Sequence, residues 1–130
     1  MSGLEIIELL AILRAEVGRA TMDFVTVMFG YLVCVHLIGA NLSRAKALVL
    51  SVVYSIFSFF PMIGTNTSMT HMFAILSEHR ADLVRYQELP ESIVGSGMIA
   101  LYFLTMISAW LISLGYMYQI RLSAHKAAGE

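Results

Sequence analysis

The chain has 130 residues, of which 58% are hydrophobic and 13% are charged, whereas soluble domains are about half apolar and a quarter charged. Its net charge of −1 and the absence of a basic stripe give no reason to expect a nucleic-acid partner. The single cysteine, Cys34, excludes a disulfide within the chain. The apolar excess therefore predicts that a lipid bilayer surrounds much of the protein.

The first segment, residues 1–20, is predicted to be an amphipathic helix. Ser2 and Glu5 have the spacing of a capping box, which satisfies free backbone N–H groups at a helix start. Apolar side chains from Ile6 to Val17 share one helical face, glutamates occupy the other, and Gly18 is the expected end. We expect this helix to lie along a surface rather than cross the membrane. Because an acidic face does not suit anionic lipid, it should pack on protein or on the less anionic leaflet.

Three runs without a charged residue are long enough to cross the hydrocarbon, at residues 24–43, 47–77 and 92–120. Thr21 is the expected N-cap of a first transmembrane helix over 22–42. A short turn with Arg44 and Lys46 leads to a second transmembrane helix over 45–63. Pro61, Gly64 and the polar run 65–68 predict a break rather than one long kinked helix.

After the expected break, residues 67–87 predict a second amphipathic helix, outside the membrane. Its apolar face is a packing surface of Met and Leu type, made of Met69, Met72, Phe73, Leu76 and Leu83. Pro90 marks a new helix start, the third transmembrane helix covers 92–120, and 121–130 is a tail. The sequence thus predicts an all-α, small polytopic membrane protein with three transmembrane helices and two amphipathic helices in one membrane domain.

The charges at the two ends of the spans bear on orientation. Four Lys or Arg residues fall on each side of the predicted membrane, so the positive-inside rule alone gives no answer. Arg44 and Lys46 are concentrated in one very short loop, and eight of nine acidic residues lie on the other side. These two features favour the N-out, C-in orientation.

Small and polar residues form stripes along the three spans. The stripes predict close helix packing, with hydrogen bonds across the helix contact. The alternative is a water-lined path in an oligomer, with the serines of the second span as its wall and Asp23 at its mouth. The sequence does not decide whether they face the same chain or another one. The candidate interhelical or pore-lining residues are Asp23, Gly30, His36, Ser51, Ser55, Ser58, Thr105 and Ser108.

Three residues in the spans bear on chemistry or on packing. His36 is an ionisable side chain inside a span, and we expect a neutral imidazole bonded to a neighbouring helix or reaching the headgroups, with a proton, metal or haem role as the alternative. Cys34 lies in mid-span, where apolar surroundings make a thiol inert. Trp110 lies near the middle of the third span, which predicts that this part of the helix faces protein.

The sequence contains no set of nucleophile, base and orienting residue, and no metal or cofactor motif. We therefore expect a non-enzymatic subunit without a cofactor, which associates with itself or docks onto another membrane protein through helix packing. The alternatives are an oligomeric pore or channel, for which a phage-holin-like protein is an architectural comparison only, and a redox or proton-handling subunit that uses His36.

Overall fold

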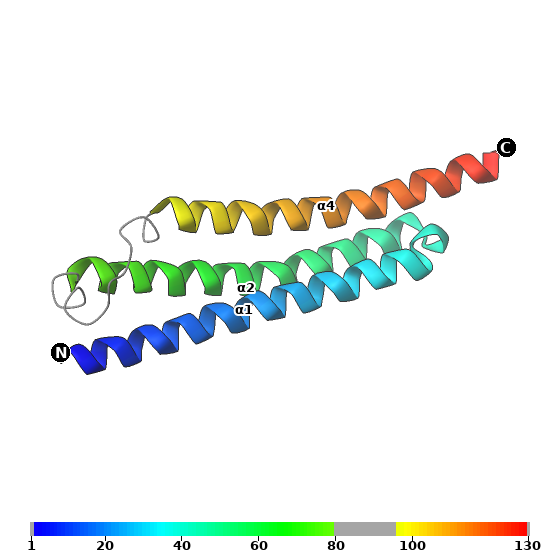
Figure 1. Cartoon of the computed structure of the whole chain (residues 1–130). Coiled ribbons are helices and arrows are strands. Elements are labelled where there is room, and N and C mark those ends of the chain that lie inside the picture. The colour runs from blue at the N-terminus through cyan, green and yellow to red at the C-terminus, as the bar shows by residue number, and fades with distance from the viewer. Residues whose placement is uncertain (1, 80–95, 130) are drawn as a thin grey trace.

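The computed structural model describes residues 2–79 and 96–129, which form three long helices and one short 3-10 turn. The helices are α1 (Gly3–Ile38), α2 (Arg44–Glu78) and α4 (Ser96–Gly129), and the turn η1 (Gly39–Asn41) joins α1 to α2. α1 and α2 run antiparallel side by side, and α4 lies along the hairpin, with the C-terminus beyond the η1 end (Figure 1). The described residues contain no strand, and the all-α prediction is confirmed.

Each long helix contains an apolar segment suited to a bilayer. At 1.5 Å per residue, helices of 34 to 36 residues are about 50 to 54 Å long, well beyond the roughly 30 Å of the hydrocarbon. All three pass the length and hydropathy requirements of a membrane span. The three predicted spans are therefore present, each as part of a longer helix.

The predicted break at Gly18 is wrong, because α1 is continuous through it. A glycine that ends a helix adopts positive φ, and no described residue does so. Thr21, the expected N-cap of the next helix, is instead an interior residue whose hydroxyl donates to the Val17 carbonyl at 2.7 Å. The capping box at Ser2 and Glu5 is confirmed, since each residue bonds the other's backbone N–H.

The predicted break at Pro61 and Gly64 is also wrong, because α2 runs through both residues. The hydroxyls of the polar run satisfy their hydrogen bonds inside the helix: Thr65 donates to the Pro61 carbonyl and Thr67 to the Ile63 carbonyl. Hydroxyls bonded in this way do not require a helix end at these residues, and transmembrane helices tolerate an interior proline.

The C-terminal residues differ from the predicted tail. Residues 121–129 continue α4 as helix, and Gly129 is its last residue. The predicted start of the third span at 92–95 lies outside the described residues. So does the stretch 80–87 of the second amphipathic helix, with Leu83 on its predicted face.

The predicted amphipathic segments pack against each other as the outer part of the α1–α2 hairpin. Ile6 and Leu13 of α1 are buried, and Met69, Met72, Phe73 and Leu76 of α2 are half-buried. The Ser68 hydroxyl donates to a carboxylate oxygen of Glu16 across the pair, at 3.4 Å. The N-terminal segment thus packs on the extension of α2. The prediction that it forms a separate helix lying along the membrane surface is wrong, because α1 continues without interruption from Gly3 to Ile38.

Two apolar clusters join α4 to the hairpin. The first surrounds Phe24, Met62 and Met106, and the second, nearer η1, surrounds Tyr31, Tyr54 and Met117. Each cluster takes a residue from all three helices. At η1, a Cβ on Gly39 would lie 3.3 Å from Val35 Cγ1 and 3.4 Å from Met117 Sδ, so glycine permits the close approach of α4 there.

Candidate functional site

The serine stripe of α2, made of Ser51, Ser55 and Ser58, lies between the helices of the chain. The Ser51 hydroxyl is hydrogen-bonded to the Tyr31 hydroxyl of α1 at 3.0 Å, and Ser55 Oγ accepts a bond from Trp110 Nε1 of α4 at 3.3 Å. Ser58 is fully buried, and its hydroxyl has no hydrogen-bond partner among the described residues. The stripe therefore contacts α1 on one side and α4 on the other, which is the close-packing interpretation of the sequence.

Aromatic side chains fill the same seam. The rings of Tyr31 and Tyr54 are stacked, with centroids 4.0 Å apart and planes 8° from parallel. Trp110 packs on Phe59 with ring centroids 5.1 Å apart. The prediction that the Trp110 region of the third span faces protein is confirmed. Tyr31 was not singled out by the sequence, although a tyrosine in mid-span needs a partner for its hydroxyl and that need could have indicated it.

The stripe of α1 faces outward. Asp23, Thr26, Gly30 and Cys34 are all exposed, and a Cβ added to Gly30 would meet nothing within 4 Å. The Thr26 hydroxyl is bonded to the Met22 carbonyl of its own helix. No neighbouring helix of the described chain explains the small side chains at these positions. We call the surface of Thr26, Gly30 and Cys34 the α1 outer face.

The polar stripe of α4 is divided between two directions. Ser113 is buried and donates to the Ala109 carbonyl at 2.7 Å. Thr105 and Ser108 are exposed, and the Thr105 hydroxyl donates to the Leu101 carbonyl. The structure thus brings Ser51, Ser55 and Ser58 together in the seam and leaves Asp23, Gly30, Thr105 and Ser108 on the outside.

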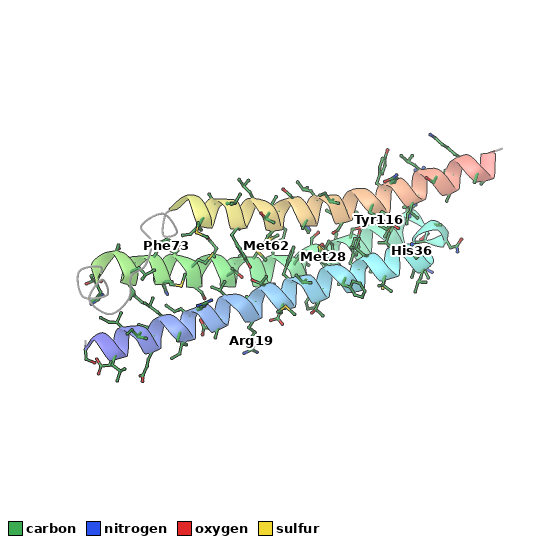
Figure 2. All side chains as sticks on the ribbon, viewed as in Figure 1. Arg19, Met28, His36, Met62, Phe73 and Tyr116 are labelled. Carbon is green, nitrogen blue, oxygen red and sulfur yellow. The ribbon has the colours of Figure 1, made fainter. Side chains whose placement is uncertain are left out.

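His36 lies near the η1 end and points toward α4, where its Nδ1 is 3.1 Å from the Tyr116 hydroxyl (Figure 2). The expected hydrogen bond of this imidazole to a neighbouring helix is therefore present. The pair closes one end of an apolar groove of about 690 Å³ between α1 and α4. The groove is lined mainly by aliphatic and aromatic side chains, including Phe29, Val33 and Ile112.

Arg121 fixes α4 to the turn between α1 and α2. Its Nη1 donates to the Leu42 carbonyl at 2.9 Å and to the Ser43 carbonyl at 3.2 Å. At the opposite end of the spans, the hydroxyls of Thr21 and Tyr102 are hydrogen-bonded. These two contacts hold α4 in register with the hairpin. The sequence showed Arg121 only as an end-of-span charge, because carbonyl acceptors at a turn leave no pattern.

The described residues contain no group of three His, Cys, Asp or Glu side chains that could hold a metal ion. No protein-family model matches the chain, and neither does any curated protein or solved structure with which it was compared. The three long apolar helices place the chain in the class of helical, multi-pass integral membrane proteins.

Proposed function

We propose that this protein is a non-enzymatic subunit of a membrane assembly, and that it binds another transmembrane helix through the α1 outer face. One observation carries the proposal: Gly30 lies in mid-span on an exposed face where the chain itself gives no packing reason for a glycine. Small residues one turn apart let two helix backbones approach closely in lipid, where van der Waals packing drives association.

The α1 outer face lies at the right depth for such a contact. The segments 23–41, 46–65 and 102–121 each have polar residues at both ends and a length of about 27 to 29 Å, close to the hydrocarbon thickness of roughly 30 Å. This register agrees with the Thr21–Tyr102 bond at one edge and the Arg121 contacts at the other. Gly30 and Cys34 then fall within the hydrocarbon, and Asp23 falls at its edge.

The part of the α1–α2 hairpin that extends outside the hydrocarbon supplies a second contact surface. Residues 3–22 of α1 extend about 30 Å past the hydrocarbon, and residues 66–78 of α2 about 20 Å. Glu5, Glu8 and Glu16 are exposed on this extension. An acidic, rigid hairpin outside the bilayer suits an accessory subunit that also touches the water-soluble part of its partner.

Oxidative crosslinking of the native protein in membranes tests the proposal directly. Cys34 is the only cysteine, and although its surroundings are apolar, its side chain is exposed on the α1 outer face and is accessible to an oxidant that enters the bilayer. Self-association through this face predicts a disulfide-linked dimer with copper phenanthroline, which Cys34→Ala abolishes. Gly30→Leu should reduce the crosslinked fraction at least about fivefold, since a bulky side chain separates the backbones.

Gly64→Leu is the matched control, because Gly64 is also an exposed helical glycine with nothing within 4 Å of an added Cβ, but lies on α2. It should leave crosslinking unchanged. Equal losses for both variants would refute a role for the α1 outer face. If no dimer forms but a larger membrane protein co-purifies and is lost with Gly30→Leu, the partner is a different chain; if Gly30→Leu changes neither result, the proposal fails.

A pore formed by several copies is the second candidate, favoured by the position of Asp23 on the same side of α1 as Gly30. Copies packed around this face would bring their Asp23 carboxylates together at the edge of the bilayer, as in cation-selective rings. The serines of α2 would not line such a path, because they lie within the chain. Ion flux in liposomes that falls with Asp23→Asn would support a pore, and no flux from the crosslinked oligomer would refute it.

A further inference from the structure

We infer that the seam between α2 and α4, at the η1 end, binds an anionic phospholipid with its phosphate on Arg44 and Arg121. Two adjoining hollows define the site, of about 500 Å³ and 350 Å³. Arg44, Arg121 and His125 line both of them, so these three side chains stand where the hollows meet. The inference does not depend on the proposed subunit role, which rests on a different face of the protein.

The electrostatics of this end favour an anionic headgroup. Among the described residues, every carboxylate lies on the first 23 residues of the chain or at Glu78, toward the other end of the hairpin. Arg121 is held in place by the Leu42 and Ser43 carbonyls through one nitrogen, Nη1. A guanidinium has five N–H donors, so donors on Nη2 and Nε are left for a phosphate.

The larger hollow continues from the basic residues into an apolar channel. Its walls are Ala47 and Leu48 on α2 and Leu114, Met117 and Leu122 on α4. From Leu114 to Arg121, which lies at the edge of the hydrocarbon, the helix rises about 10 Å, or about two thirds of one leaflet. Tyr118 lines the same hollow, as tyrosines do at headgroup level. A basic mouth above an apolar channel about two thirds of a leaflet deep matches a phosphate with the first part of an acyl chain.

Free phosphate would use only the mouth of the site, and an apolar ligand only the channel. A phospholipid uses both, and in the expected N-out, C-in orientation this end faces the cytoplasmic leaflet, where anionic lipids attract basic segments next to the membrane. The residues thus specify a lipid with net negative charge rather than a zwitterionic one.

Native mass spectrometry of the purified full-length protein tests the inference, with phosphatidylglycerol and phosphatidylcholine of identical chains as competing probes. We expect phosphatidylglycerol to be retained at least about fivefold more, and Arg44→Gln to reduce that preference about fivefold, the effect of one basic charge at a membrane surface. Lys46→Gln is the matched control, because it removes one charge from the same turn but Lys46 lines neither hollow.

The possible outcomes separate a site from general attraction. Equal loss of phosphatidylglycerol in Arg44→Gln and Lys46→Gln would overturn the inference, as would equal retention of the two lipids by the native protein. Displacement of the bound lipid by millimolar inorganic phosphate or glycerophosphoglycerol would show that the headgroup alone binds, which also contradicts it. Since Arg121 fixes α4, Arg44 is the residue to change first.

Discussion

Ser55 and Ser58 lie about one turn apart on α2, and replacing each with alanine should change the stability of the helix bundle in opposite directions. Ser55→Ala removes the acceptor of the Trp110 indole N–H, a 3.3 Å bond between α2 and α4. Interhelical hydrogen bonds in membranes contribute about 0.6 kcal/mol on average, and an unpaired indole N–H adds to the loss. We expect Ser55→Ala to lower the free energy of unfolding by about 1 kcal/mol.

Ser58→Ala removes a hydroxyl that is 0% exposed and has no hydrogen-bond partner within the described residues. An unpaired buried hydroxyl costs about 1 to 3 kcal/mol when water is the alternative. A separated helix in lipid offers little water either, so only part of that cost is recovered. We expect a gain of about 0.5 kcal/mol, and the two variants then differ by about 1.5 kcal/mol, roughly tenfold in the unfolding equilibrium.

Reversible unfolding by sodium dodecyl sulfate in mixed micelles measures both variants. Trp110 is the only tryptophan and lies between α2 and α4, so its fluorescence reports the separation of these helices. The midpoint should move to lower detergent for Ser55→Ala and to higher detergent for Ser58→Ala. Equal shifts in the same direction would refute the placement of the two serines in the seam.

Three further predictions use the same unfolding measurement. Pro61→Ala should stabilise the protein by about 1 to 3 kcal/mol, because α2 is helical through Pro61 and proline lacks the backbone N–H; a loss of helix by circular dichroism would contradict a continuous α2. Arg121→Gln should destabilise by about 1 to 2 kcal/mol because α4 loses two carbonyl contacts to the turn, and Arg121→Lys should fall between it and the native protein. Tyr102→Phe should cost about 0.6 kcal/mol through its bond to Thr21, and no change would place the two helices in a different register.

The predicted helix ends at Gly18 and at Pro61 were wrong, because other interactions keep the chain helical at these positions. Pro61 followed by Thr65, Asn66 and Thr67 has the composition of a loop, but threonine hydroxyls can bond the carbonyl four residues earlier as readily as they cap a new helix. At Gly18 the glycine costs a helix only about 1 kcal/mol, which packing of the α1–α2 extension outweighs. At Gly18 a local pattern cannot show this, because the packing contacts come from another helix.

For the candidate residues, too, the sequence predicted packing but not the packing partner. Stripes of small residues on three helices were visible from spacing, and they predicted packing without naming a partner. The structure places Ser51 and Ser55 against Tyr31 and Trp110, whereas it leaves Gly30 facing outward. Rotation of each helix about its axis decides which stripe meets which neighbour.

The sequence by itself determined that the chain is helical and crosses a bilayer, because uncharged apolar runs of 20 or more residues can satisfy their backbone in lipid only as helices. It also showed charged residues at or near the ends of the uncharged runs, such as Asp23, Arg44 and Arg121. Only the tertiary structure decided that, over residues 2–79 and 96–129, three long helices replace the five shorter ones predicted, and that the serines of α2 lie between α1 and α4. The physical reason is that packing between helices depends on their rotation and register, which contacts such as Arg121 to the Leu42 carbonyl fix across 79 residues of sequence.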